Sequence, residues 1–245
     1  MHTIARLAAV LGLCLVAQGV RADIILIDFG TVAQRHSVGV ADSSGNFWDY
    51  ITGVTDNNLD LINSDGVATE VDLALSGFTG GGPATYNAGL LPDSGLNGGV
   101  FAYTNVTDDA VFFTATDSPV MTLSGLNDAF TYDLTFYGSR VNASTRFTTY
   151  QVGAGSVELQ TSGSTLTGSW NADTVVTLSG LTSVGGTLAI SMAGNTQAGQ
   201  AGTATFGYIN AMQINVVPEP STALLIMLGG LAGLYARATR RATAG

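Results

Sequence analysis

The sequence predicts an all-β protein: a single jelly-roll-like β-sandwich, with an N-terminal signal helix before it and a C-terminal transmembrane helix after it. Three observations support this prediction. Short apolar or alternating runs recur along residues 23–216, clusters of Gly, Asn, Asp and Ser separate them, and apolar residues show no helical spacing outside the two ends. The composition agrees, because 32 glycines and a charged fraction of 11% suit many turns and few ion pairs.

Nine runs are expected to form the strands of this domain. The first, 24–29, is mostly apolar, and the second, 67–75, alternates with Val71, Leu73 and Leu75 on one face. Seven similar runs follow, each bounded by turn residues: 110–115, 120–123, 130–137, 146–152, 174–178, 187–192 and 206–216. Short strands with turns at this spacing are typical of a sandwich or jelly roll.

A short pattern occurs twice among these runs. Residues 122–126 read Thr-Leu-Ser-Gly-Leu and precede the run at 130–137, and residues 177–181 read the same and precede the run at 187–192. We interpret each copy as a strand, a glycine turn and a returning strand. Two copies do not make a repeat protein, so they are expected to be similar hairpins within one sandwich.

Residues 1–22 have the three parts of a secretory signal peptide. A short basic start includes Arg6, an apolar stretch covers 7–16, and small residues at 20–22 form a cleavage pattern. The apolar stretch is too short to span a bilayer. The alternative is a buried N-terminal helix. We expect the mature chain to begin at Asp23, without the single cysteine of the sequence.

The C-terminal residues 217–245 contain three features in order. They are the Pro218-Glu219-Pro220 motif, an apolar segment at about 222–236, and a basic tail at 237–245. The prolines prevent a strand or helix from running through the motif. A helix over 221–236 would measure roughly 24 Å, short against a hydrocarbon core of about 30 Å, and would be a marginal anchor.

The basic tail determines the expected orientation of this anchor. It contains Arg237, Arg240 and Arg241, and such clusters stay on the cytoplasmic side of a membrane. The domain at 23–216 is then expected outside the cytoplasm, in agreement with the signal peptide.

This C-terminal arrangement resembles the PEP-CTERM sorting signal. The resemblance implies that an exosortase, a membrane protease, recognises Pro218, Glu219 and Pro220 as a sorting motif and not as catalytic residues. It also implies export across the inner membrane, a transient membrane anchor that ends at the arginine stop, and delivery to the cell envelope, surface or extracellular matrix. The alternative is an ordinary tail anchor.

Several segments of the domain also resemble galactose-binding-like and malectin-like jelly-roll domains, which are found beside polysaccharide lyases and esterases. These segments occur in the same order along the chain: 27–30, 46–49, 65–69, 132–140, 146–150 and 204–211. The resemblance implies a β-sandwich, and it leaves the ligand open because many such domains have no known ligand.

Charge excludes one class of partner. Between Asp23 and Val217 there are 17 acidic residues against three arginines, which leaves a formal charge of −14. Such a surface repels phosphate backbones, so no nucleic-acid partner is expected, and it attracts divalent cations or basic partners. Catalysis is not expected either, because His36 is the one histidine of this region and no Gly-x-Ser-x-Gly motif accompanies it.

Two kinds of binding residue are candidates. Trp170, in a polar turn, is the candidate platform for a sugar ring, whereas Trp48 is interpreted as a core residue. Arg140 and Arg146 are two of the three cations of the domain. Each is expected either to pair with a carboxylate across a strand or to face a sugar.

Calcium is the candidate cofactor. Asp56, Asp60 and Asp65 place hard oxygen donors on turns, as Ca²⁺ prefers, and residues 42–46 form a second candidate loop. Neither matches the EF-hand spacing. The alternative is that Asp and Asn occur there because they suit turns.

The leading hypothesis from the sequence is a non-enzymatic envelope or matrix protein whose sandwich associates with extracellular polysaccharide. The second is a structural surface protein without affinity for sugars. An enzyme is the third, and it would need His36 close to paired carboxylates in a concave site.

Overall fold

The computed structural model describes one compact unit, Arg21–Val217. The described residues are 23–31, 39–55, 57–58, 60–85, 101, 109–195 and 206–218. The predicted signal peptide and the predicted membrane helix lie outside these residues. Within them, every regular element is a strand except the 3₁₀ turn Thr167–Ser169, and none is a helix with the length and hydropathy of a membrane span.

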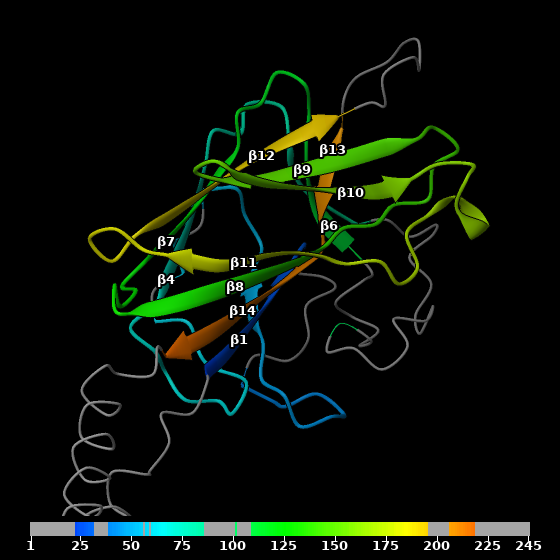
Figure 1. Ribbon diagram of the computed structural model, residues 1–245. Coiled ribbons are helices and arrows are strands. Elements are labelled where there is room, and N and C mark those ends of the chain that lie inside the picture. The colour runs from blue at the N-terminus through cyan, green and yellow to red at the C-terminus, as the bar shows by residue number, and fades with distance from the viewer. Residues whose placement is uncertain are drawn as a thin grey trace, which may run out of the picture. The chain divides into compact units, whose positions relative to one another are not determined.

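Two large sheets form the layers of a β-sandwich (Figure 1). The first sheet has the order β11 (Val176–Thr182), β8 (Phe130–Tyr137), β14 (Ala211–Pro218), β1 (Asp23–Phe29), β2 (Asp49–Ile51). The second has the order β10 (Gly155–Ser162), β9 (Arg146–Val152), β12 (Leu188–Asn195), β7 (Val120–Ser124), β4 (Asp72–Ser76), β3 (Asn57–Asn58). A small third sheet has the order β13 (Gly207–Ile209), β6 (Asp109–Phe113), β5 (Gly82–Thr85).

The main core lies between the two large sheets, and alternation along the strands supplies it. In β8, Tyr132, Leu134 and Phe136 are buried while the residues between them are half-exposed. The ring of Phe136 stacks on that of Tyr150 in β9 with centroids 4.1 Å apart, which joins the two layers directly. Burying one such side chain contributes about 1.5–3 kcal/mol.

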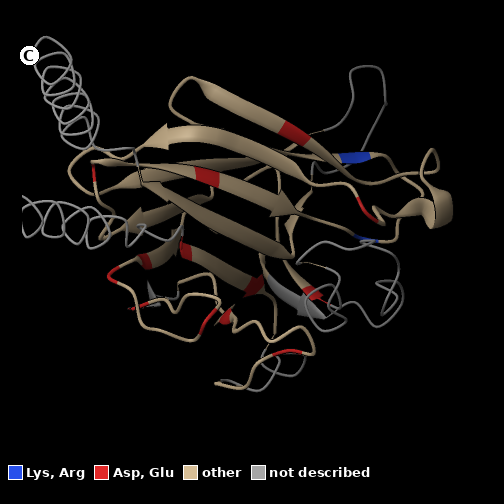
Figure 2. Cartoon of the chain, turned by 60° about the horizontal axis from the view of Figure 1, so that its bottom comes forward, with Lys and Arg blue, Asp and Glu red and all other residues tan. Residues whose placement is uncertain are grey.

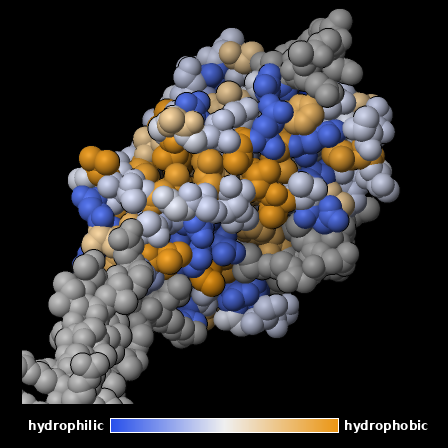
Figure 3. Space-filling model, viewed as in Figure 1, coloured by the Kyte–Doolittle hydropathy of each residue, from blue (hydrophilic) through white to orange (hydrophobic). Residues whose placement is uncertain are grey.

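The core reaches the surface along one side of the sandwich. There the edge strands β10 and β11 lie close to each other, one from each layer, and Figure 3 shows apolar surface between them. Val157 of β10 and Val176 of β11 are half-buried and pack against the core.

Strand β1 is buried on both faces, which explains why its sequence is nearly continuous in apolar residues. Ile25 and Ile27 face the main core, whereas Leu26 belongs to a second cluster. The members of this cluster are Leu26, Trp48, Phe101, Tyr137 and Ala211. Trp48 is only 2% exposed, so its interpretation as a core residue is confirmed.

The all-β prediction is confirmed, and most of the predicted strands are present. The run at 206–216 is two strands, because the buried Asn210 interrupts it and accepts a hydrogen bond from the amide of Ser139 at 2.7 Å. The run at 67–75 forms a strand only from Asp72, and Val67 is 58% exposed. Four strands were not predicted: β2, β3, β5 and β10.

The hairpin interpretation of the repeated pattern is wrong. β7 pairs with β12 in the second sheet, and β8 pairs with β11 in the first, so each copy crosses from one layer to the other. Gly125 makes one crossing possible: its φ is +73°, and a Cβ there would lie 1.7 Å from the carbonyl oxygen of Glu70. The crossings place the apolar faces of all four strands toward the shared core.

Candidate functional site

Two of the predicted ligand residues meet at one tyrosine. Arg140 follows the end of β8, Arg146 begins β9, and Tyr208 lies in β13. The Nη1 of Arg140 donates to the phenol oxygen of Tyr208 at 3.1 Å, and the Nη1 of Arg146 donates to the same oxygen. With Phe206, these residues form what we call the arginine cluster.

Aromatic rings hold both guanidinium groups. The Cζ of Arg146 lies 4.7 Å from the centroid of the Phe206 ring, and the Cζ of Arg140 lies 5.4 Å from that of Tyr208. These are cation–π distances. Among the described residues Arg146 contacts these rings and the phenol, and the carboxylate partner predicted for it is not found there.

Hydrogen bonds from β9 fix the backbone of Tyr208. Its amide donates to the Oγ1 of Thr148 at 2.9 Å, and its carbonyl oxygen accepts from the hydroxyl of Tyr150 at 3.0 Å. Burial raises the pKa of the Tyr150 hydroxyl far above its ordinary value, and the hydrogen bond with Thr148 offsets little of this, so Tyr150 stays a donor. Tyr208 itself is fully buried, and the cluster is therefore preorganised.

Trp170 lies at the same end of the domain. It follows the 3₁₀ turn and forms an isolated bridge with Ser162, and Ser162 is also the register partner of Arg146. Arg146, Ser162 and Trp170 thus occupy one cross-strand row. Since paired residues present their side chains on the same face, the half-buried indole and a guanidinium of the cluster share that face.

Hydrogen bonds among buried polar groups fix Asn171, the residue after Trp170. The carbonyl oxygen of Asn171 accepts from the hydroxyls of Tyr137 at 2.9 Å and Ser139 at 2.8 Å, and the amide side chain of Asn171 donates to the carbonyl of Gly138. Burial raises the pKa of the Tyr137 hydroxyl to about 12, so it too remains a donor. Because Asn171 is fixed by these bonds, the backbone of the preceding residue, Trp170, is fixed as well.

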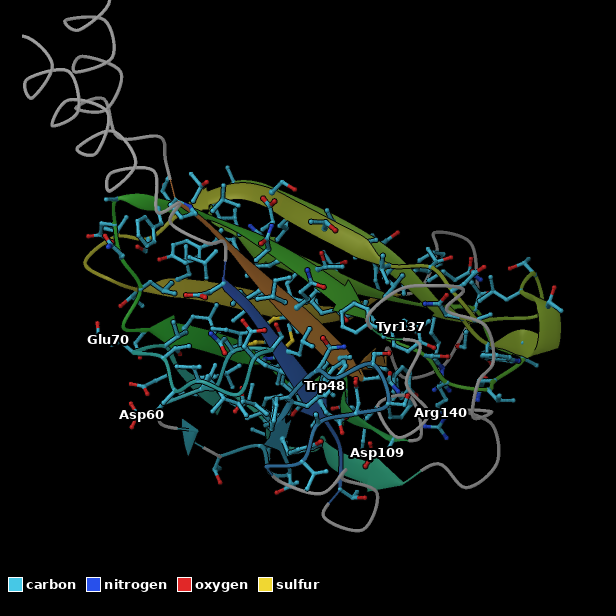
Figure 4. The ribbon with its side chains drawn as sticks, turned by 90° about the horizontal axis from the view of Figure 1, so that it is seen from below. Trp48, Asp60, Glu70, Asp109, Tyr137 and Arg140 are labelled. Carbon is cyan, nitrogen blue, oxygen red and sulfur yellow. The ribbon has the colours of Figure 1, made fainter. Side chains whose placement is uncertain are left out.

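Charge is distributed unevenly over the described residues. Figure 2 shows the two arginines at one end of the domain, with the acidic residues spread over both strands and loops. Figure 4 shows Asp60 and Glu70 at the opposite end from Arg140, with Trp48 between. Among the residues that the structure describes, both arginines of the domain thus belong to the arginine cluster.

The residues predicted to bind calcium are not brought together within the described part of the chain. Asp56 lies outside it. Asp60 and Asp65 are exposed, and the amide of Asp60 donates to the Oδ1 of Asp72 at 2.8 Å. No group of three or more His, Cys, Asp or Glu residues gathers within the ranges that the structure describes. Calcium binding by these residues stays a prediction.

The second calcium candidate, the loop at 42–46, has protein donors around its carboxylate. The carboxylate of Asp42 accepts from the amides of Ser44 at 2.8 Å and Asn46 at 2.9 Å, and from the Nε1 of Trp48 at 2.9 Å. Burial raises the pKa of Asp42, but these hydrogen bonds outweigh it and hold the pKa below its ordinary value. The loop thereby fixes Trp48 in the second cluster.

Sequence reasoning missed two further carboxylates that organise turns. Asp117 accepts from the amides of Thr114 at 2.6 Å and Gly80 at 2.8 Å, and although burial opposes it, such bonds lower its pKa well below the ordinary value. The Ser183 hydroxyl and the amides of Gly186 and Gly185 likewise lower the pKa of Asp128. Turn-forming Asp residues were visible in the sequence, but their distant partners were not.

Comparison with known families concerns the C-terminal segment. Residues 216–241 match the family model described as the PEP-CTERM protein-sorting motif. The chain carries a PEP-CTERM sorting motif. The motif indicates an exosortase-sorted surface protein that is exported and sorted through a membrane anchor. No curated protein and no solved structure matches the chain.

The matched segment contains every residue predicted for sorting: Pro218, Glu219, Pro220, Arg237, Arg240 and Arg241. The prediction of a sorting signal is confirmed. Pro218 is the last residue of β14, and the other five lie outside the described residues.

Proposed function

We propose that this exosortase substrate is a non-enzymatic component of the cell envelope or extracellular matrix, and that its sandwich associates with extracellular polysaccharide. The binding surface is the arginine cluster together with Trp170. The observation that carries the proposal is the convergence of Arg140 and Arg146 on Tyr208, with Trp170 in the cross-strand row of Arg146.

The chemistry of these groups suits a sugar chain. Each guanidinium has five N–H donors in a fixed plane, and the hydroxyl and carboxylate oxygens of polysaccharides accept from them. The face of an indole provides apolar area on which a sugar ring packs.

A second candidate function has an observation in its favour. Both guanidinium groups already donate to a buried phenol, so the cluster also fastens the third sheet to β9. If that is its whole role, the protein is a structural surface protein without affinity for sugars.

A binding measurement separates the two functions. The full chain, purified in detergent, is titrated with exopolysaccharide of the native host, and saturable binding is expected. Trp170→Ala and Arg146→Gln should each weaken it roughly tenfold or more, as central aromatic and arginine contacts do. Phe147→Ala is the matched control, because Phe147 follows Arg146 on β9 and presents its side chain to the opposite face. Absence of saturable binding, or equal effects of all three variants, would reject the proposal.

A further inference from the structure

The sorting motif continues directly from a central strand of the first sheet. β14 lies between β8 and β1, and its last residue, Pro218, is the first residue of the Pro-Glu-Pro motif. The pairing with β1 continues almost to the motif: Asn215 faces Ile24, and Val216, two residues before Pro218, faces Asp23. The strand that leads into the motif thus lies between two neighbouring strands, with β1 paired up to Val216 and Thr131 of β8 bonded to the carbonyl oxygen of Val217.

The sequence leaves little chain between this strand and the membrane segment. Three residues separate Pro218 from Thr222, where the apolar segment begins. Four residue-to-residue steps reach at most about 14 Å, even when fully extended. A membrane protease that takes the motif must therefore work next to the end of the folded sheet.

We propose that the exosortase acts on a state in which the C-terminal end of β14, from Asn215 onward, has separated from β1 and β8. Sorting is then coupled to local opening of the first sheet. The step is conformational and precedes any bond cleavage, and it is independent of polysaccharide binding.

The contacts of the strand end suit such opening. The Oγ1 of Thr131 reaches the carbonyl oxygen of Val217 at 3.4 Å, a long hydrogen bond, and Asn215 and Val217 are only half-buried. Val216 is the one residue of this end that reaches the main core. Strand ends of this kind open locally at a small fraction of the cost of global unfolding.

A disulfide across the last pairs tests the proposal. Cys14 is the single cysteine of the sequence. With Cys14 replaced by Ser, Ile24→Cys with Asn215→Cys can form one specific bond between register partners, at a Cα separation that disulfides accept. The matched control is Gln151→Cys with Ser156→Cys, an exposed register pair at the far edge of the second sheet. Formation of each disulfide is verified by mass before the assay.

The assay follows loss of the C-terminal segment. The oxidised full chain is incubated with membranes that contain the exosortase, and the products are resolved by mass spectrometry. Processing of the I24C/N215C chain is expected to be about tenfold slower than that of the control pair, and a reductant should restore it. Equal rates for the two oxidised chains would overturn the proposal.

An insertion provides a second test that does not need the disulfide. Four residues, Gly-Ser-Gly-Ser, placed between Val217 and Pro218 add roughly 13 Å of reach and free the motif from the sheet. Processing should become several-fold faster, and the oxidised I24C/N215C chain should be rescued. The same insertion between Gly153 and Ala154, at the exposed tip of the β9–β10 hairpin, should change nothing. No acceleration by the first insertion would contradict the proposal even if the disulfide variant failed to fold.

Discussion

The two ends of β14 are held very differently. The residues around its start, 207–211, are fully buried and bonded through side chains: Asn210 binds Ser139 and Asp109, and Tyr208 receives both arginines. Its last residues, 215–218, are mostly half-buried, and the side-chain bond that reaches them is the long one from Thr131. The start of β14 is thus rigid and lies next in sequence to β13, which carries Tyr208 of the arginine cluster, whereas the far end of the same strand is the part proposed to open for sorting.

The largest loss of stability is expected from Asn210→Ala, just before the start of β14. The substitution removes the acceptor of the buried Ser139 amide and the donor to the Asp109 carbonyl. Leaving such groups unsatisfied should lower the free energy of unfolding by about 3 kcal/mol, measured by urea denaturation. Asn195→Ala is the control, since Asn195 is exposed on β12 and bonds to Glu158. Equal losses in the two variants would show that the start of β14 is not specially held.

Acid should weaken three turns that are held by carboxylates, a feature that neither end of β14 shares. The pKa values of Asp42, Asp117 and Asp128 are lower in the folded chain than the ordinary 3.8, so their stabilisation is present above that pH and is lost as pH falls toward the lowered values. The melting temperature should be level from pH 7 to about 5 and fall below about 4. In Asp117→Asn the decrease of the melting temperature below about pH 4 should be smaller than in the unmodified protein. An equal decrease would show that Asp117 does not contribute to it.

A smaller effect is expected from Tyr208→Phe. The ring and its packing stay, but both guanidinium groups lose the oxygen to which they donate. A loss of about 1–2 kcal/mol in the free energy of unfolding is expected by chemical denaturation. The control is Tyr132→Phe, whose hydroxyl serves the turn at Asn127 instead. Polysaccharide binding weakened in Tyr208→Phe alone would tie the phenol to placement of the arginines.

The smallest change in stability is expected at the C-terminal end of β14. Thr131→Val removes the 3.4 Å bond to Val217 and should change the free energy of unfolding by less than about 0.5 kcal/mol. Amide hydrogen exchange should nevertheless be faster at Val216 and Val217 and unchanged at Tyr208. A large loss in the free energy of unfolding would contradict the interpretation that the C-terminal end of β14 is held more weakly than its start.

The sequence predicted those elements whose structure depends on residues close to one another in the chain. The alternation in β8, the continuous apolar run of β1 and the Pro-Glu-Pro segment each carry their information within a few residues. β10 was missed because its sequence, Gly-Ser-Val-Glu-Leu-Gln-Thr-Ser, has two apolar residues among polar ones and lies at a sheet edge. The layer crossings were missed because a glycine turn looks the same whether the chain returns to its own sheet or enters the other.

The candidate site was predictable only as separate residues. Arg140, Arg146 and Trp170 were each singled out by type, but Tyr208, 62 positions beyond Arg146, gave no local sign that it would join the arginines. The burial of Asn210 and its split of a long apolar run likewise depend on contacts more than 70 positions away. Tertiary packing, which no single stretch encodes, decides these positions.

The pairing of β1 with β14 also sets the order of events during biogenesis. These adjacent central strands come from opposite extremes of the domain, so the first strand lacks one neighbour until the ribosome has made nearly the whole polypeptide. Such remote pairing slows folding. The first sheet is therefore completed late, and late completion suits the export that the sorting motif indicates.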